Sequence, residues 1–457
     1  MSMRKLGVLF ISLLLLSVIS VSAHENKVQD DPLKSAERQW KLLFDESVEW
    51  YGFGYFQNAL RGFKRLLVKD RKHANVNFYV AMCYYYMRRP ADIIVPYLEK
   101  AVVKVDPYYS YSYKEKSAPV FAWLYLGEMY MYTYKFDAAE KAFREFKTYL
   151  TDRNRDAAYL IQVNNWLENV VNAKEFYANK NKSITVQNMK QLNSNYNDYK
   201  PFLSRDGTKL FMTTERKGTT GGQYLRDVYK ADVYLVLNKR GNWSRPKKLA
   251  YRINSKSDDM CPSMGEGDKY LVYSREDKNK KDYNLYYAEA NGKRFKAPQK
   301  FNPNINTKHN ESSPYIVLNG SVMYFSSDKP GGYGGKDIYM AERMPNGEWG
   351  RPYNLGPNIN TDKDEDCPFV LDDGVTLFFS SKGHKNMGGY DIFVSTLSDE
   401  GIWSEPENMG YPINTTYDDI GFMMTPDGTK GYYATARDAH ENAYINNLDI
   451  FEIFFGE

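Results

Sequence analysis

From residue 181 to its end, the chain alternates hydrophobic and polar residues in short runs, and one block of this pattern occurs five times. Each block opens on an acidic residue, and in four of the five a proline follows three positions later. The opening segments are Asp198–Pro201, Asp259–Pro262, Glu311–Pro314, Glu365–Pro368 and Asp418–Gly421. Their last positions lie 61, 52, 54 and 53 residues apart, a spacing that predicts a β-propeller.

Each repeat supplies four strand patterns, as the third repeat illustrates. An apolar run follows its proline, an alternating run covers residues 322–326, and a run led by an acid begins at Asp337. The outermost run starts at Trp349 and has a proline three residues later, which an edge strand tolerates. Alternation of β-branched and aromatic residues with period two predicts strands.

The last repeat stops after its third strand, at Phe454-Phe455. The missing outer strand has a match at the other end of the repeat region, where Asn188–Ser194 resembles Asn354–Thr361 with one residue deleted. We therefore expect the N-terminal strand to complete the C-terminal blade. This gives five blades and a ring without free sheet edges.

Residues 32–178 instead show helical periodicity. The clearest unit carries tetratricopeptide (TPR) signature residues in their usual spacing, namely Trp123, Leu126, Gly127, Tyr130, Ala139 and Phe143. Two weaker units precede it, with Ser47 and Cys83 at the small position, and residues 156–177 read as a capping helix. Gly62 and Pro96 are poor helix formers and blur the boundaries of the weaker units.

The predicted fold class is multidomain α and β. A TPR α-solenoid (24–180) follows a signal peptide (1–23) and precedes an all-β five-bladed propeller (181–457). Arg4 and Lys5, a short apolar stretch and a small-residue cleavage site at residues 21–23 indicate secretion to the periplasm. The mature chain then has no second long apolar run, so we expect no transmembrane span.

The first helix of each TPR unit would line a concave groove for an extended or helical peptide. The signature register projects nine apolar or aromatic residues onto it. They are Phe44, Val48, Tyr51, Val80, Tyr84, Met87, Leu124, Met131 and Tyr132. The alternative is that another part of the chain, such as the capping helix, fills this groove.

The chain has three cysteines, a small and odd number that argues against a disulfide framework. Cys83 is expected to be a small buried residue between helices. Cys261 and Cys367 occupy the same repeat position two blades apart, beyond the span of a disulfide, so we expect free thiols.

The propeller repeat resembles the WD40-like PD40 family of TolB-type periplasmic propellers. The glycine-rich runs 330–339 and 386–393 and the Asn-Ile-Asn-Thr turn at residues 358–361 carry the resemblance. The order of signal, helical repeats and propeller resembles Bacteroidota envelope proteins associated with type IX secretion. Those relatives usually continue into an OmpA-like peptidoglycan-binding domain, whereas this sequence ends with the propeller, so peptidoglycan binding is not carried over.

The recurring acids invite two interpretations. Five-fold closure would place Asp198, Asp259, Glu311, Glu365 and Asp418 in a ring at one channel mouth, a site for a cation or a basic peptide. Alternatively, each carboxylate accepts backbone N–H groups in its own inter-blade turn, which repetition in every blade favours. The recurring asparagines (193, 254, 306, 360 and 414) have the same two interpretations, and repetition again favours a structural role in the turns. The glycine-rich loops are interpreted as turns rather than as phosphate-binding loops.

Catalytic signals are sparse. Five-bladed glycosidases place two or three carboxylates at the channel and break the repeat there, but outlying acids such as Asp366 are few. The five histidines are scattered without metal-ligand spacing, and formal net charge is only +4, which does not favour nucleic acid. We therefore expect no enzyme activity, no cofactor and no metal.

The sequence thus favours a periplasmic scaffold that binds envelope proteins or peptide segments through the TPR groove and a propeller face. The resemblance implies a type IX secretion or gliding assembly and association with outer-membrane proteins. Two alternatives remain: a glycan-binding or glycan-cleaving propeller of a carbohydrate-uptake system, and a TolB-like propeller that binds an envelope lipoprotein or a peptidoglycan-associated partner.

Overall fold

The computed structural model describes residues 32–225, 228–250, 252–277, 282–292, 294–317, 319–437 and 447–456, and the predicted signal peptide lies outside these ranges. Within them the chain forms two compact units. Unit 1 runs to Met129 and resumes over Glu145–Thr151, whereas unit 2 comprises Tyr130–Arg144 and Asp152–Glu457. Among the described helices, none has the length and apolarity to cross a membrane.

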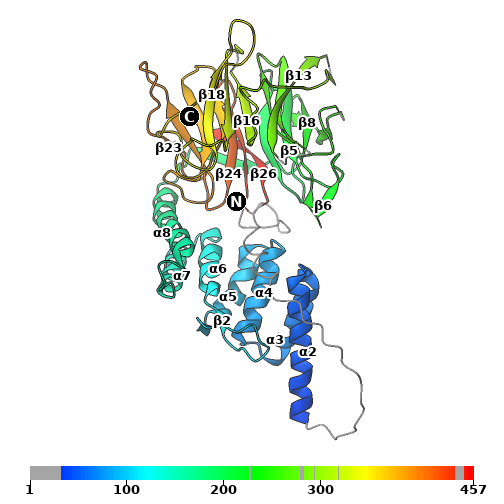
Figure 1. Ribbon diagram of the computed structural model, residues 1–457, viewed down its shortest axis with the longest axis vertical. Coiled ribbons are helices and arrows are strands. Elements are labelled where there is room, and N and C mark those ends of the chain that lie inside the picture. The colour runs from blue at the N-terminus through cyan, green and yellow to red at the C-terminus, as the bar shows by residue number, and fades with distance from the viewer. Residues whose placement is uncertain are drawn as a thin grey trace. The chain divides into compact units, whose positions relative to one another are not determined.

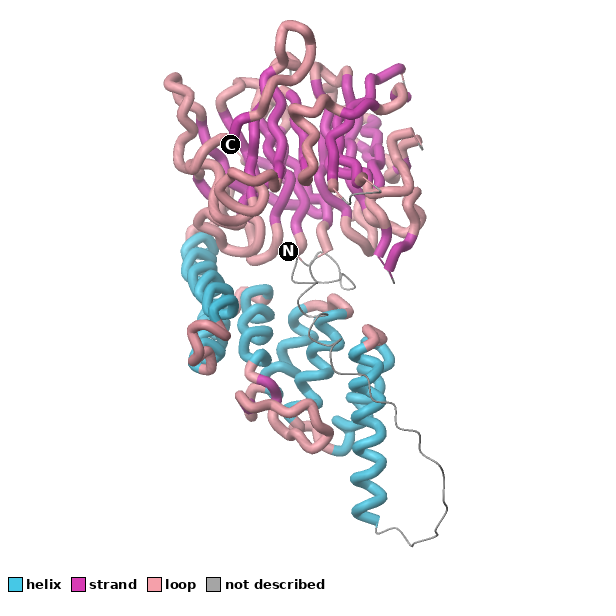
Figure 2. Tube along the Cα trace, in the orientation of Figure 1, coloured by secondary structure: helices cyan, strands magenta, loops and turns pink. Residues whose placement is uncertain are grey.

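Helices occupy the N-terminal part of the chain and strands the C-terminal part (Figures 1 and 2). The helices are α2 (Pro32–Gly52), α3 (Phe56–Lys69), α4 (Ala74–Tyr86), α5 (Ala91–Ala101), α6 (Phe121–Tyr132), α7 (Phe136–Thr148) and α8 (Ala157–Ala178). In unit 1, α3 packs against both α2 and α4, and α4 packs against α5. Phe63 of α3 stacks on Tyr79 of α4 with ring centroids 4.7 Å apart, so aromatic side chains fill the space between successive helices.

The two poor helix formers of this region both lie inside helices, which corrects the boundaries they seemed to mark. Gly62 lies in α3 because α2 passes close by: a Cβ at this position would lie 1.9 Å from Ser47 Oγ. Pro96 lies inside α5. Between α5 and α6, the short parallel strands β1 (Val105–Asp106) and β2 (Ala118–Pro119) close a loop at its base.

The propeller has five antiparallel sheets, and the first strand of each lies innermost. The strands of blade one are β4 (Asp198–Leu203), β5 (Lys209–Thr214), β8 (Asp232–Lys239), β9 (Asn242–Trp243) and β10 (Lys247–Lys248). Those of blade two are β11 (Asp259–Gly265), β12 (Tyr270–Glu276), β13 (Tyr283–Asn291), β14 (Arg294–Phe295) and β15 (Gln299–Lys300). Those of blade three are β16 (Glu311–Ile316), β17 (Val322–Ser327), β18 (Asp337–Glu342) and β19 (Tyr353–Asn354).

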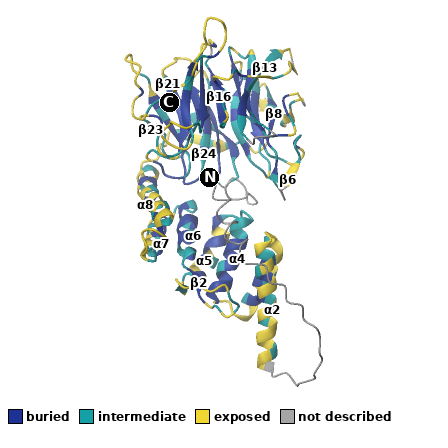
Figure 3. Cartoon of the chain, in the orientation of Figure 1, coloured by how far each residue is buried: buried dark blue, intermediate teal, exposed yellow. Residues whose placement is uncertain are grey.

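Blade four contains β20 (Glu365–Val370), β21 (Thr376–Ser381), β22 (Asp391–Thr396) and β23 (Glu407–Asn408). Blade five contains β24 (Asp419–Met424), β25 (Lys430–Thr435), β26 (Asp449–Phe455) and the early strand β3 (Ile184–Asn188). A small hairpin of β6 (Gln223–Leu225) and β7 (Val228–Tyr229) extends a loop of blade one. Second strands such as β17 and β21 are buried along nearly their whole length, because each blade is packed between two neighbours (Figure 3).

The predicted closure of the ring is confirmed. β3 pairs antiparallel with β26, from Asn188 opposite Phe451 to Ile184 opposite Phe455. Just beyond β3, Asn193 clamps the same strand: its Nδ2 donates to Ile450 O at 2.9 Å, and its Oδ1 accepts from Ile450 N at 2.8 Å. The N-terminal strand of the repeat region thus completes the blade formed by the end of the chain.

The structure shifts the register of the fifth repeat by one residue. Asp419, not Asp418, pairs with Thr435 as Asp198 pairs with Thr214 in blade one. The correct spacing between opening acids is therefore 61, 52, 54 and 54 residues. Two adjacent aspartates satisfy the same pattern, and only strand pairing distinguishes them.

Candidate functional site

The inter-blade turns account for the predicted acidic ring. In every blade the opening carboxylate accepts the backbone N–H of the residue four positions earlier, at 2.5 to 3.0 Å. The five donor–acceptor pairs are Ser194 with Asp198, Ser255 with Asp259, Thr307 with Glu311, Thr361 with Glu365, and Thr415 with Asp419. All five carboxylates are fully buried. This corrects their proposed place at an open channel mouth and confirms the turn interpretation.

The second partner of these carboxylates differs between blades. In blades one, two and five an arginine reaches the acid, and the Arg216–Asp198 contact is 2.6 Å. In blades three and four the partners are hydroxyls: Ser327 Oγ donates to Glu311 and Ser381 Oγ donates to Glu365. Burial raises the pKa of Glu311 to about 7, and it also raises the pKa of Asp419 to about 6 although Arg437 reaches that carboxylate.

Asp418 belongs to a different repeated contact. The residue before each opening acid accepts, through its side-chain oxygen, a backbone N–H of the preceding blade, at 2.7 to 3.1 Å. These acceptors are Asn197, Asp258, Asn310, Asp364 and Asp418. Asp418 is partly exposed, but its side chain accepts the backbone N–H of Tyr390 at 2.9 Å. This hydrogen bond links two neighbouring blades.

The recurring asparagines are also structural, as predicted. Each clamps one residue of the preceding third strand by accepting its N–H and donating to its carbonyl, as Asn360 does with Ile338. The other four asparagines repeat this geometry: Asn193 with Ile450, Asn254 with Val233, Asn306 with Leu285 and Asn414 with Ile392. The glycines of the predicted turns permit close approach between blades: a Cβ on Gly388 would lie 2.4 Å from Thr415 O.

The candidate groove residues of the helices lie largely inside the molecule. Four of the nine are buried, namely Phe44, Val80, Leu124 and Met131, so these four do not line an open groove. The remaining five are partly buried, namely Val48, Tyr51, Tyr84, Met87 and Tyr132. In unit 1, Phe44 contacts the rings of Phe63 and Tyr79, because the groove face of one helix is covered by its neighbours. Binding of a partner by these side chains stays a prediction.

Tyr132 has a partner within its own unit. Its ring stacks on Tyr417 of the propeller with centroids 4.4 Å apart, and Tyr417 OH donates to Tyr132 O at 3.2 Å. The predicted capping helix, α8, docks beside it: Asn169 and Asn172 donate to backbone carbonyls of Gly388 and Asn386 at 2.7 and 2.9 Å. The glycine-rich loop of blade four therefore supports α8.

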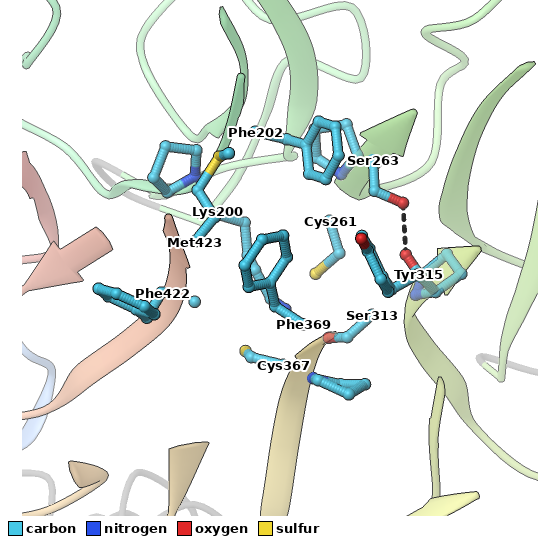
Figure 4. A pocket seen from close by; sticks show the side chains of 15 residues that line it. Lys200, Phe202, Cys261, Ser263, Ser313, Tyr315, Cys367, Phe369, Phe422 and Met423 are labelled. Carbon is cyan, nitrogen blue, oxygen red and sulfur yellow. Dashed lines mark hydrogen bonds between the residues drawn. The ribbon is translucent and has the colours of Figure 1, made fainter. Parts of the chain in front are cut away.

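The five innermost strands enclose a cavity of about 30 Å³ in the channel (Figure 4). Each strand contributes three consecutive residues to its wall. They are residues 200–202, 261–263, 313–315, 367–369 and 421–423. The first residue of each triplet sits in a β-bulge and has a positive φ, between 52° and 69°. These first residues are Lys200, Cys261, Ser313, Cys367 and Gly421.

Aromatic rings form part of the cavity wall. The rings of Tyr315 and Phe369 lie 5.2 Å apart, and Phe202 lies 6.2 Å from Tyr315. Tyr315 OH donates to Val370 O at 2.8 Å, and Ser263 Oγ donates to Pro314 O at 2.6 Å (Figure 4). Hydrogen bonds thus hold these side chains in place.

One charged cluster adjoins this wall. Asp366 forms an ion pair with Lys336 at 3.0 Å and accepts the N–H of Cys367 at 2.8 Å. Burial alone would raise the pKa of Asp366, but the charges of Lys336 and Lys200 hold it below its usual value. Sequence reasoning had singled out Asp366 but missed both lysines, although Lys200 occupies the repeat position of the two cysteines.

The thiols are free, as expected, and His384 contacts a turn carbonyl. All three cysteines are free and buried, and burial raises the pKa of Cys367 to about 12, so the thiol stays protonated at neutral pH. His384 Nε2 lies 3.0 Å from Ile359 O and serves a turn. Within the part of the chain that the structure describes, no three potential metal-ligating side chains form a cluster.

No protein-family model matches the chain, and its sequence matches no curated protein. Solved structures resemble its propeller. A putative TolB from Agrobacterium tumefaciens is 14% identical, covers 57% of this chain and 79% of its own, and has a TM-score of 0.36. An α-L-arabinofuranosidase from Podospora anserina in complex with cellotriose is 14% identical over 57% and 91%, with a TM-score of 0.40. An endo-arabinase from Bacteroides thetaiotaomicron is 17% identical over 55% and 92%, with a TM-score of 0.37. These similarities assign neither a substrate nor a partner.

Proposed function

We propose that this protein is a non-enzymatic scaffold of the cell envelope that binds other proteins. The observation that carries the proposal is a loop of unit 1, residues 106–116, which exposes two tyrosines on an anchored backbone. Tyr108 is 91% exposed and Tyr111 is 76% exposed. Exposed rings on an ordered loop lose little entropy on binding, and tyrosine is enriched at the centres of protein interfaces.

The anchoring of this loop is specific. The strands β1 and β2 pair at its base. Tyr109 OH donates to Asn75 Oδ1 of α4 at 2.6 Å, and Tyr113 OH donates to Glu37 Oε1 of α2 at 3.2 Å. The ring of Tyr109 also supports Tyr111, with centroids 4.9 Å apart. The loop thus presents its two outward rings in a fixed arrangement.

The charges of the channel support binding over hydrolysis. Glycoside hydrolysis requires two carboxyl groups facing the substrate, one of them protonated. Asp366 is instead neutralised by Lys336, and the carboxylates with raised pKa, such as Glu311, lie in buried turns. The TPR-like signature and the resemblance to type IX secretion-associated proteins support a secretion or gliding assembly as the setting.

A photo-crosslinking experiment tests this function. A benzoylphenylalanine placed at Tyr111 of the full chain should give one discrete adduct with an envelope protein on irradiation of cells. The same amino acid at Tyr353, an exposed tyrosine of the propeller edge, is the matched control and should not give that adduct.

Two results would contradict the proposal. One is the same adduct pattern at both positions. The other is release of sugar from arabinan, xylan or peptidoglycan by the purified chain, with loss of that activity in Asp366→Asn. Binding of an envelope lipoprotein only through the propeller control position would favour the TolB-like alternative.

A further inference from the structure

The channel bulges carry side chains that the fold does not require. Every bulge needs a left-handed backbone, and blade five supplies it with Gly421 at φ 69°. The other four blades use side-chain-bearing residues, at a cost of about 1 kcal/mol each relative to glycine. Because glycine satisfies the same repeat geometry in blade five, the identities of Lys200, Cys261, Ser313 and Cys367 must have another cause.

Two of these side chains have unused hydrogen-bonding capacity. Ser313 Oγ is buried, with the residue 2% exposed, and makes no hydrogen bond of ordinary geometry among the described residues, although Ser313 lies close enough to Asp366 to lower the pKa of that carboxyl. Lys200 forms no ion pair with a carboxylate in the described part of the chain, and its ammonium faces the thiol of Cys367. Gly421 leaves room for it, because a Cβ there would lie 2.8 Å from Lys200 Cδ. A buried donor without an acceptor is costly unless a ligand or water satisfies it.

The cavity is positively charged and rich in donors. Lys336 and Asp366 cancel each other at 3.0 Å, which leaves the charge of Lys200. The thiols of Cys261 and Cys367 are protonated because burial raises the pKa of each, so they present S–H groups rather than negative charge. Figure 4 shows these groups and Ser313 around one space. The matching ligand carries one negative charge and accepts hydrogen bonds.

The size of the cavity narrows the choice. About 30 Å³ holds roughly two water molecules. A carboxylate is smaller and flatter than a tetrahedral phosphate, so it suits that space better. The rings of Tyr315 and Phe369 suit a short apolar tail, and Lys200 is partly exposed. We propose that the propeller channel binds a small carboxylate, paired with the Lys200 ammonium and accepting a hydrogen bond from Ser313 Oγ.

Saturation-transfer NMR with acetate on the full chain tests this site, at ionic strength held constant with sodium chloride. We expect saturable binding to the wild type and at least about tenfold weaker binding to Lys200→Gly, since a charge-assisted hydrogen bond contributes that much. Ser313→Ala should weaken binding less. Lys200→Gly should fold, because blade five already carries glycine at this position.

The matched control is Arg240→Gly. Arg240 is a cation with φ 54° in an exposed turn. This variant therefore removes one positive charge, and one side chain from a residue with left-handed backbone, outside the channel. Acetate should bind Arg240→Gly as it binds the wild type. Equal acetate binding by Lys200→Gly, no saturable binding by the wild type, or equal displacement by chloride and by formate would each overturn the proposal. If Lys200→Gly fails to unfold cooperatively, Lys200→Met provides the same comparison. The result is independent of any protein partner.

Discussion

At the scale of single residues, the same repeat position has different hydrogen-bond partners in different blades. An opening carboxylate is always buried and always accepts a turn N–H, but its remaining oxygen meets arginine in three blades and a hydroxyl in two. Repetition in the sequence therefore predicted the turn contact but not the second partner, which lies 16 to 18 residues further along and varies between blades.

Glu311 gives the clearest pH prediction. Its pKa rises from 4.5 to about 7 on folding because burial disfavours the charged form. The folded state therefore holds this proton more tightly than the unfolded chain. This contribution to stability is complete below pH 4.5 and is lost as the pH rises through 7, and it amounts to about 3 kcal/mol.

In Glu311→Gln the amide can still accept the turn N–H but does not ionise. We expect its urea midpoint to fall less between pH 5 and pH 8 than that of the wild type. Equilibrium unfolding at both pH values measures this difference. An identical fall in both proteins would show that Glu311 does not titrate in this range.

At the scale of elements, the strand order and the closing strand were predictable, because alternation and a missing fourth strand are both visible in the sequence. The helix faces were less predictable. The TPR signature gives the face of each helix but not what covers it, and Phe44 proved to be covered by neighbouring rings. Tyr132 likewise contacts a propeller residue 285 positions away, which no local pattern reveals.

Gly62 of α3 provides a prediction at this scale. In Gly62→Ala the new methyl group would meet Ser47 Oγ, so either Ser47 gives up its hydrogen bond to Leu43 O or α2 and α3 move apart. We expect a loss of about 1–3 kcal/mol of stability, as for other overpacked sites. Ser47→Ala should restore part of it when combined with Gly62→Ala, and thermal unfolding of the double-mutant cycle measures the coupling.

Asn58 supplies the control for helix propensity. It is exposed on the same helix, so Asn58→Ala should be neutral or slightly stabilising. If Gly62→Ala were also neutral, close packing of α2 on α3 would not be the reason for the glycine.

At the scale of the whole molecule, the ring depends on contacts between the two ends of the repeat region. Asn193 and Ile450 are 257 residues apart, whereas the equivalent Asn360 and Ile338 are 22 apart. The same two hydrogen bonds therefore close the ring in one case and link neighbouring blades of a continuous chain in the other.

Asn193→Ala should release β3 from β26. Loss of the side chain leaves the Ile450 N–H without its partner, at a cost of about 1–3 kcal/mol, whereas Ile450 O keeps the bond from Met189 N. Hydrogen exchange should rise in β3 and β26 while the other blades stay protected. In Asn360→Ala, protection of β3 should be unchanged. Equal exchange of β3 in both variants would mean that Asn193 has no special role in closure.

The central claim is that the repeated acids serve the fold and that the anchored tyrosine loop serves the function. The most direct test compares three full-length baits in one envelope capture: wild type, Glu311→Gln and the double variant Tyr108→Ala/Tyr111→Ala. Quantitative mass spectrometry would measure the ratio of captured partner to bait. Truncation of a hot-spot tyrosine costs about 2 kcal/mol or more, so we expect the ratio to fall at least about tenfold for the loop variant and to match the wild type for Glu311→Gln. The opposite pattern, with capture lost in Glu311→Gln and kept in the loop variant, would contradict the account.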